Sequence, residues 1–72
     1  MNLDMFILSH LKKAQQALCL REYWDVVSEI SVLGKIDPAY GVLLSNTEEQ
    51  LVLMLRWQIA CVVNRIHIEK GH

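Results

Sequence analysis

Residues 51–63 restrict the possible folds of this chain more than any other stretch. Arg56 and Gln58 are the only polar side chains among them. Written as a helix, the stretch carries apolar side chains on almost every side, which is typical of a buried helix. The chain has only 72 residues, and a chain of this size buries a modest fraction of its surface. We therefore expect part of this helix to be covered by another protein or by a second copy.

The overall composition also favours an interaction surface. Hydrophobic residues make up 53% of the chain, against about 45–50% in ordinary soluble domains, and the mean hydropathy is +0.23. A large apolar surface usually marks a protein interface. The net charge is -1, and Lys12-Lys13 is the only adjacent pair of basic residues. Nucleic-acid binding, which requires clustered basic residues, is therefore not expected.

The two cysteines indicate a reducing compartment. Cys19 and Cys61 lie far apart in the sequence, form no Cys-x-x-Cys motif and have apolar neighbours. We expect both thiols to be buried, unpaired and slow to react. With no basic leader segment at the beginning of the sequence, a cytoplasmic protein is expected. The tract 51–63 is too short to cross a bilayer, so no membrane insertion is expected.

A capping motif predicts the beginning of the last helix. In Ser45-Asn46-Thr47-Glu48, the serine is expected to accept a hydrogen bond from a backbone amide, and the glutamate to bond back to the serine amide. The helix is predicted to run from about residue 47 to residue 67. A stripe with heptad spacing is expected to pack on the first half of the chain; it consists of Val52, Leu55, Ile59, Val62 and Ile66.

The first half of the chain allows two arrangements. An apolar stripe at helical spacing includes Leu11 and Leu18, and it continues one residue out of register from Cys19 onward. Either one long helix winds its stripe around a partner, or the chain turns near residue 21 and begins a second helix. No Gly or Pro marks such a turn. The predicted fold is a single all-α domain of residues 1–72, either an antiparallel helical hairpin or three helices with a turn near residue 21.

No group of residues predicts catalysis. None of His10, His67 and His72 has a second ligand at helical spacing that could form a metal pair, so we expect solvated surface histidines. A nucleophilic Cys–His pair would need an exposed thiol, and three scattered glycines do not form a phosphate-binding loop. We expect no metal, no cofactor and no enzymatic activity.

The candidate binding residues lie mainly beside the predicted packing stripe. Leu53, Trp57 and Ala60 form a second stripe on the last helix. Trp24 falls off the apolar face of its own segment, and tryptophan is enriched among the residues that dominate protein interfaces. The predicted partner-binding residues are Leu53, Met54, Trp57, Ala60, Cys61 and Trp24.

Residues 7–40 resemble a single, degenerate tetratricopeptide repeat. The most specific part is Ile36-Asp37-Pro38-Ala39-Tyr40, which is similar to the hydrophobic-Asp-Pro-x-Tyr turn that ends the second helix of that repeat. The resemblance implies that Ala14 and Ala17 occupy packing positions of the first helix, and Val26, Ile30 and Leu33 those of the second. One repeat cannot bury both of its faces, so the resemblance also implies neighbours.

The whole chain resembles the small chaperones and co-chaperones of bacterial type III secretion, in particular those that hold the needle subunit. The resemblance lies in its size, near-neutral charge, cytosolic cysteines and capped apolar helices. It implies a bacterial cytoplasmic protein that holds an aggregation-prone secretion-system subunit through an apolar helix face. The alternative is a homodimeric helical bundle that regulates an RNA or a transcription factor.

Overall fold

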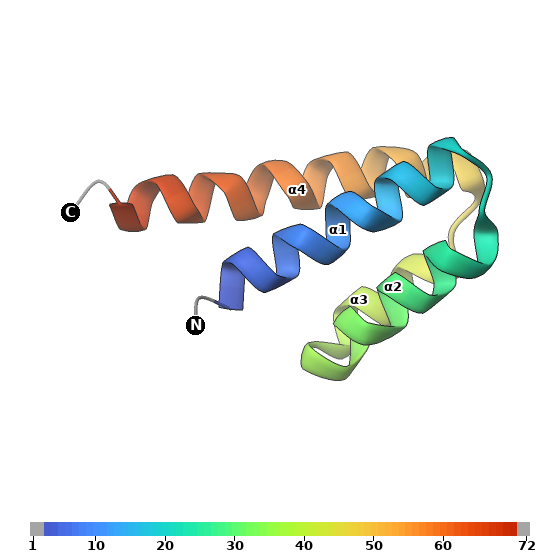
Figure 1. Ribbon diagram of the computed structural model, residues 1–72, viewed down its shortest axis with the longest axis horizontal. Helices are drawn as coiled ribbons and strands as arrows, with labels where there is room; N and C mark the ends of the chain where they lie inside the picture. The colour runs from blue at the N-terminus through green and yellow to red at the C-terminus, as the bar shows by residue number, and fades with distance from the viewer. Residues whose placement is uncertain (1–2, 71–72) are drawn as a thin grey trace.

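The computed structural model describes residues 3–70, apart from the side chain at position 70, and is helical almost throughout (Figure 1). Its elements are α1 (Leu3–Cys19), α2 (Tyr23–Ile36), α3 (Pro38–Gly41), the 3-10 helix η1 (Val42–Ser45) and α4 (Glu48–Lys70). Residues 3–70 contain no strand, which confirms the predicted all-α class.

The turn between α1 and α2 decides between the two predicted arrangements in favour of the turn near residue 21. Arg21 has a φ of 59°, in the left-handed region. Its amide donates to the carbonyl of Leu18 at 3.1 Å, and the Glu22 amide donates to the carbonyl of Ala17 at 2.8 Å. These two bonds form a Schellman motif, which satisfies the last carbonyls of a helix. The left-handed position of this motif is normally glycine. Because arginine occupies it here, the sequence contains no glycine that would indicate the turn.

α1 is the central helix of the fold. It lies between α2 and α4 and runs antiparallel to both (Figure 1). The backbones of α2 and α4 do not contact each other within the described chain. All three long helices supply side chains to one hydrophobic core, and burial of each large aliphatic side chain contributes about 1.5–3 kcal/mol. The largest fully buried side chains are Leu11, Ile30, Leu33, Leu55 and Val62.

The segment after the Asp-Pro turn is short. Asp37 accepts a hydrogen bond from the Ala39 amide at 3.0 Å, and Pro38 occupies the first helical position, where its missing N–H has no cost. α3 ends after four residues and continues as η1. Both pack along α2, with Tyr40 and Leu43 buried. The packing residues implied by the tetratricopeptide resemblance are buried, namely Ala14, Ala17, Val26, Ile30 and Leu33. The long helix that follows, α4, packs on α1.

The beginning of α4 corrects the predicted capping motif. Thr47 Oγ1 accepts a hydrogen bond from the Gln50 amide at 3.2 Å, and Gln50 Oε1 accepts one from the Thr47 amide at 3.1 Å. This is a capping box two residues later than expected. Ser45 instead donates to the Val42 carbonyl at 2.6 Å, because it belongs to η1. α4 also ends at Lys70, beyond the predicted end at residue 67.

Polar side chains connect the three long helices. Arg65 Nη2 of α4 donates to Asp4 Oδ1 of α1 at 3.0 Å, and the Asp4 carboxylate raises the pKa of the Arg65 guanidinium. His10 Nδ1 of α1 pairs with Glu29 Oε2 of α2. The His10 ring also packs against Phe6, with centroids 4.5 Å apart. The prediction that His10 is a solvated surface residue is therefore wrong, since the side chain is partly buried and paired.

Candidate protein-binding surface

The inner face of α4 packs on α1 largely as the sequence predicts. Leu55, Val62 and Ile66 are buried in the core, while Val52 and Ile59 are partly buried against it. Leu51 is also buried, although the predicted packing stripe did not include it. α1 thus covers one side of this apolar helix.

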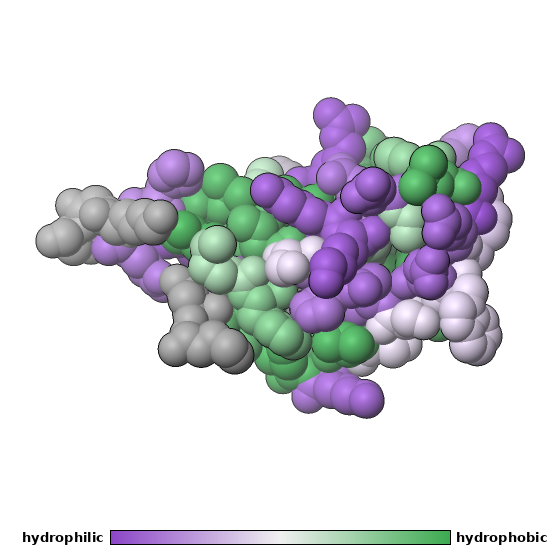
Figure 2. Space-filling model, viewed as in Figure 1, coloured by the Kyte–Doolittle hydropathy of each residue, from purple (hydrophilic) through white to green (hydrophobic). Residues whose placement is uncertain are grey.

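The opposite side of α4 is apolar and exposed. Leu53 is 64% exposed, Trp57 69% and Ile68 56%. With about 3.6 residues per turn, the side chains at these positions point away from the buried inner face. Figure 2 shows hydrophobic side chains over α4 toward its C-terminal end and a band of hydrophilic side chains across α1 and α2. We call this surface the outer stripe; it consists of the exposed Leu53, Trp57, Ala60, Asn64 and Ile68, with the half-buried Cys61 at its edge.

The outer stripe brings together four of the six predicted binding residues. Leu53, Trp57 and Ala60 are exposed, and Cys61 lies half-buried at one edge. Met54 does not belong to the stripe, because it is partly buried against the core. Ile68 was not among the predicted binding residues. Its helical spacing from Trp57 and Asn64 could have identified it.

Trp24 lies on a different surface. It is on α2, whose backbone does not contact α4, and it is 82% exposed, the highest value among the exposed large hydrophobic residues. Leu20, Tyr23 and Val27 are exposed around the same turn. The structure therefore places Trp24 in a separate apolar patch at the α1–α2 turn, away from the outer stripe.

A small groove separates this patch from the beginning of α4. Its volume is about 200 Å³, and apolar side chains from α1, α2, η1 and α4 line it, among them Leu18, Val26, Leu44 and Leu51. Tyr23 Oη lies 3.1 Å from both carboxylate oxygens of Glu48 across the groove. Desolvation of the Tyr23 hydroxyl and its bond to Glu48 raise the pKa of Tyr23.

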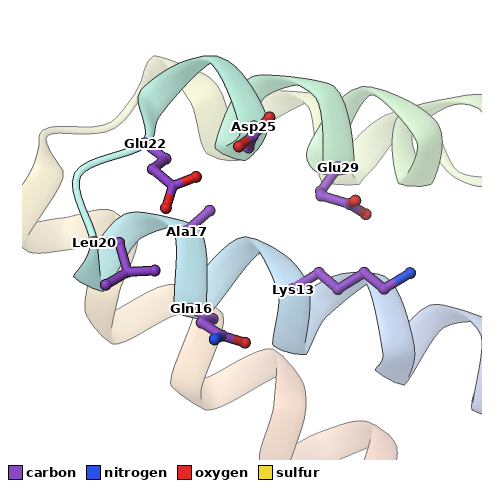
Figure 3. A pocket seen from close by; sticks show the side chains of 7 residues that line it. All are labelled: Lys13, Gln16, Ala17, Leu20, Glu22, Asp25 and Glu29. Atoms are coloured by element: carbon purple, nitrogen blue, oxygen red, sulfur yellow. The ribbon is translucent and has the colours of Figure 1, made fainter.

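A second pocket, of about 260 Å³, lies between α1 and α2 and carries three carboxylates along one side. Glu22, Asp25 and Glu29 line its α2 side, and Lys13 comes from α1 (Figure 3). The hydrogen bond to Asp25 raises the pKa of the exposed Glu22 carboxyl, as does the negative charge of Asp25. Among residues 3–70, no group of three or more His, Cys, Asp or Glu side chains is arranged to hold a metal ion.

The two thiols differ in accessibility. Cys19 is exposed and Cys61 is half-buried, and both are free. The prediction that both are buried is therefore wrong for Cys19. Cys19 follows the buried Leu18 at the end of α1, but its own side chain points away from the core.

α4 also has the length and composition of a membrane-spanning helix. The segment Glu48–Glu69 has 22 residues, and an 18-residue stretch within it has a mean hydropathy of 1.3. The expectation that no segment is long enough considered the tract 51–63 alone, and the observed helix is longer. Of this 18-residue apolar stretch, 22% is buried inside the protein, because the inner face of the helix packs on α1.

Comparison of the chain with protein-family models, with curated proteins and with solved structures finds no match.

Proposed function

We propose that this chain is a protein-binding module that holds an apolar helix of another protein against the outer stripe of α4. One observation carries the proposal: the outer stripe stays exposed although the inner face of the same helix is already packed on α1. Trp57 is 69% exposed, although tryptophan is highly buried on average in folded proteins. An amphipathic helix laid along such a stripe would bury both partners' apolar side chains.

The chaperone hypothesis follows from the kind of segment that such a surface would bind. A helix whose apolar face is unpaired tends to aggregate, and a protein that covers this face keeps the helix soluble. We therefore propose a chaperone or co-chaperone that acts in the cytoplasm. The proposal that its client is a subunit of a bacterial secretion system rests on the resemblance to the small type III secretion chaperones.

Two tryptophans provide a matched test. The tagged protein would be purified from its native cells, and the co-purified proteins would be identified by mass spectrometry. Trp57→Ala should reduce recovery of the specific partner, because loss of a central tryptophan typically costs about 2 kcal/mol or more. Trp24→Ala removes an even more exposed indole from a different surface and should leave recovery unchanged.

The opposite result would place the binding site on the other surface. If Trp24→Ala loses the partner and Trp57→Ala keeps it, the patch at the α1–α2 turn is the interface and the outer stripe is not. If both variants retain every co-purified protein, the proposed function is wrong. Circular dichroism of each variant would show that the helices are intact.

A further inference from the structure

We propose that the outer stripe is self-complementary and that, in the absence of a client, two copies of this chain pair through it with their α4 helices antiparallel. The inference rests on the proposed function, because it uses the same surface, and it identifies a second copy of the chain as one occupant. A client helix would then replace the second copy.

The order of residues along the stripe carries the inference. Leu53 and Ile68 lie at equal distances on either side of the point between Ala60 and Cys61, and so do Trp57 and Asn64. A two-fold axis through that point places each member of such a pair opposite the other member in the second copy. A closed symmetric dimer requires this kind of self-complementary surface.

The paired side chains match in chemistry as well as in position. Leu53 would face Ile68 of the second copy, so that two exposed aliphatic side chains are buried together. The Trp57 indole N–H is a donor that needs an acceptor on burial, and the amide oxygen of Asn64 would lie opposite it. Ala60 and Cys61 are small and lie at the axis, where they permit the helices to approach closely.

The rest of the fold leaves room for this arrangement. α4 packs on α1 and η1, and its backbone does not contact α2. The stripe from Leu53 to Ile68 covers about 22 Å of helix at 1.5 Å per residue.

Arg56 and Arg65 lie on opposite edges of the stripe. An antiparallel two-fold brings like edges together, so it does not bring Arg56 of one copy against Arg65 of the other.

Sedimentation equilibrium of the purified full chain tests the dimer. The wild type should have about twice the monomer mass of 8.3 kDa. Ala60→Arg places two like charges at the axis and should raise the dimer Kd about tenfold or more. Ser31→Arg, which adds the same charge at an exposed position of α2, is the matched control and should leave the Kd unchanged. Unchanged helix content by circular dichroism would show that both variants are folded.

Disulfide trapping tests the antiparallel orientation. In a Cys19→Ser background, mild oxidation should link Cys61 to Cys61 of the second copy, because both lie next to the axis. In a background without native cysteines, a mixture of Leu53→Cys and Ile68→Cys chains should cross-link between the two variants. Cross-linking of Leu53→Cys chains with each other alone would indicate a parallel pair and would overturn the proposal.

Other outcomes separate the dimer from the proposed function. A wild-type chain that remains monomeric at every concentration, or a dimer that Ala60→Arg does not weaken, overturns the dimer alone, since co-purification of a client judges the proposed function independently. A monomer that floats with phosphatidylcholine vesicles would make a lipid surface the occupant and would also overturn the dimer. A dimer without any recoverable client would contradict the proposed function and leave the dimer standing.

Discussion

The hydroxyl oxygen of Tyr23 lies 3.1 Å from both carboxylate oxygens of Glu48. This contact joins the first residue of α2 to the first residue of α4, two helices whose backbones do not touch. It therefore adds a direct side-chain link between two helices that otherwise meet through α1 and η1.

We predict that Tyr23→Phe lowers the melting temperature at neutral pH. The pKa of Tyr23 is raised in the folded state by desolvation and by the bond to Glu48. A raised pKa means that the stabilisation is complete below the unfolded-state pKa near 10.0, and is lost as the pH rises through the higher folded-state value.

Melting curves of wild type and Tyr23→Phe at pH 7 and at pH above 11 would check this prediction. The difference between the two proteins should shrink at the higher pH. An equal difference at both pH values would show that the hydroxyl acts by packing and not through its bond to Glu48.

Arg21→Gly should stabilise the protein. Arg21 has a φ of 59°, and a side chain at a left-handed position costs about 1–2 kcal/mol, which glycine avoids. Since glycine also loses more entropy on folding, we expect a net gain of about 1 kcal/mol and a rise in Tm of about 4–8 °C. Arg21→Ala retains the strain and should show no such gain. A less stable Arg21→Gly protein would mean that the arginine side chain makes a compensating interaction.

This turn shows why the sequence predicts the helices better than their boundaries. Periodic apolar residues such as Ile30, Leu55 and Val62 identify the buried faces, because only one face of each helix can reach the core. The turn depends on the φ of a single residue, and a non-glycine residue at a left-handed position carries no signal in the sequence. Helix existence is therefore predictable here, and the break at Arg21 is not.

The candidate binding surface was predictable in part for the same reason. Helical spacing identifies Leu53 and Trp57 as residues of the exposed side of the last helix. It also identifies Val62 as a residue of the buried side. Exposure of Cys19 could not be read from its apolar neighbours, since the adjacent Leu20 is itself 61% exposed. The pairing of His10 with Glu29 joins two helices, and it depends on packing that local sequence patterns do not describe.

The capping box gives a prediction that separates two neighbouring hydroxyl residues. Thr47→Ala removes the acceptor of the Gln50 amide and should destabilise the protein by about 1 kcal/mol. Ser45→Ala removes only the exposed hydrogen bond to the Val42 carbonyl and should cost less. Urea denaturation of the two variants would measure the difference. A larger loss for Ser45→Ala would favour the helix start that was expected from the sequence.

The two thiols should react at different rates. Cys19 is exposed and Cys61 is half-buried, so a neutral thiol reagent should label Cys19 first in the native protein. Single Cys→Ser variants would assign each rate. If the chain pairs through the outer stripe, Cys61 should become less reactive as the protein concentration rises, whereas Cys19 should not. Equal rates for the two thiols would contradict their different exposure.

The final prediction concerns the two faces of α4. Val62 is fully buried against α1, whereas Trp57 on the same helix is 69% exposed. Val62→Ala removes buried methyl groups and leaves a cavity, so it should lower the free energy of unfolding by about 2 kcal/mol. Trp57→Ala removes a larger side chain from the surface and should leave the free energy of unfolding of the monomer within about 0.5 kcal/mol of the wild type.

Urea denaturation at low protein concentration would measure both values. Each substitution would be made in the Ala60→Arg background, so that dissociation of a dimer does not contribute. Because both variants lie on one helix, differences in helix propensity are small beside the loss of core packing. If Trp57→Ala unfolds more readily than Val62→Ala, the indole stabilises the fold itself. The outer stripe would then be part of the core, and it could not serve as the surface that binds a client.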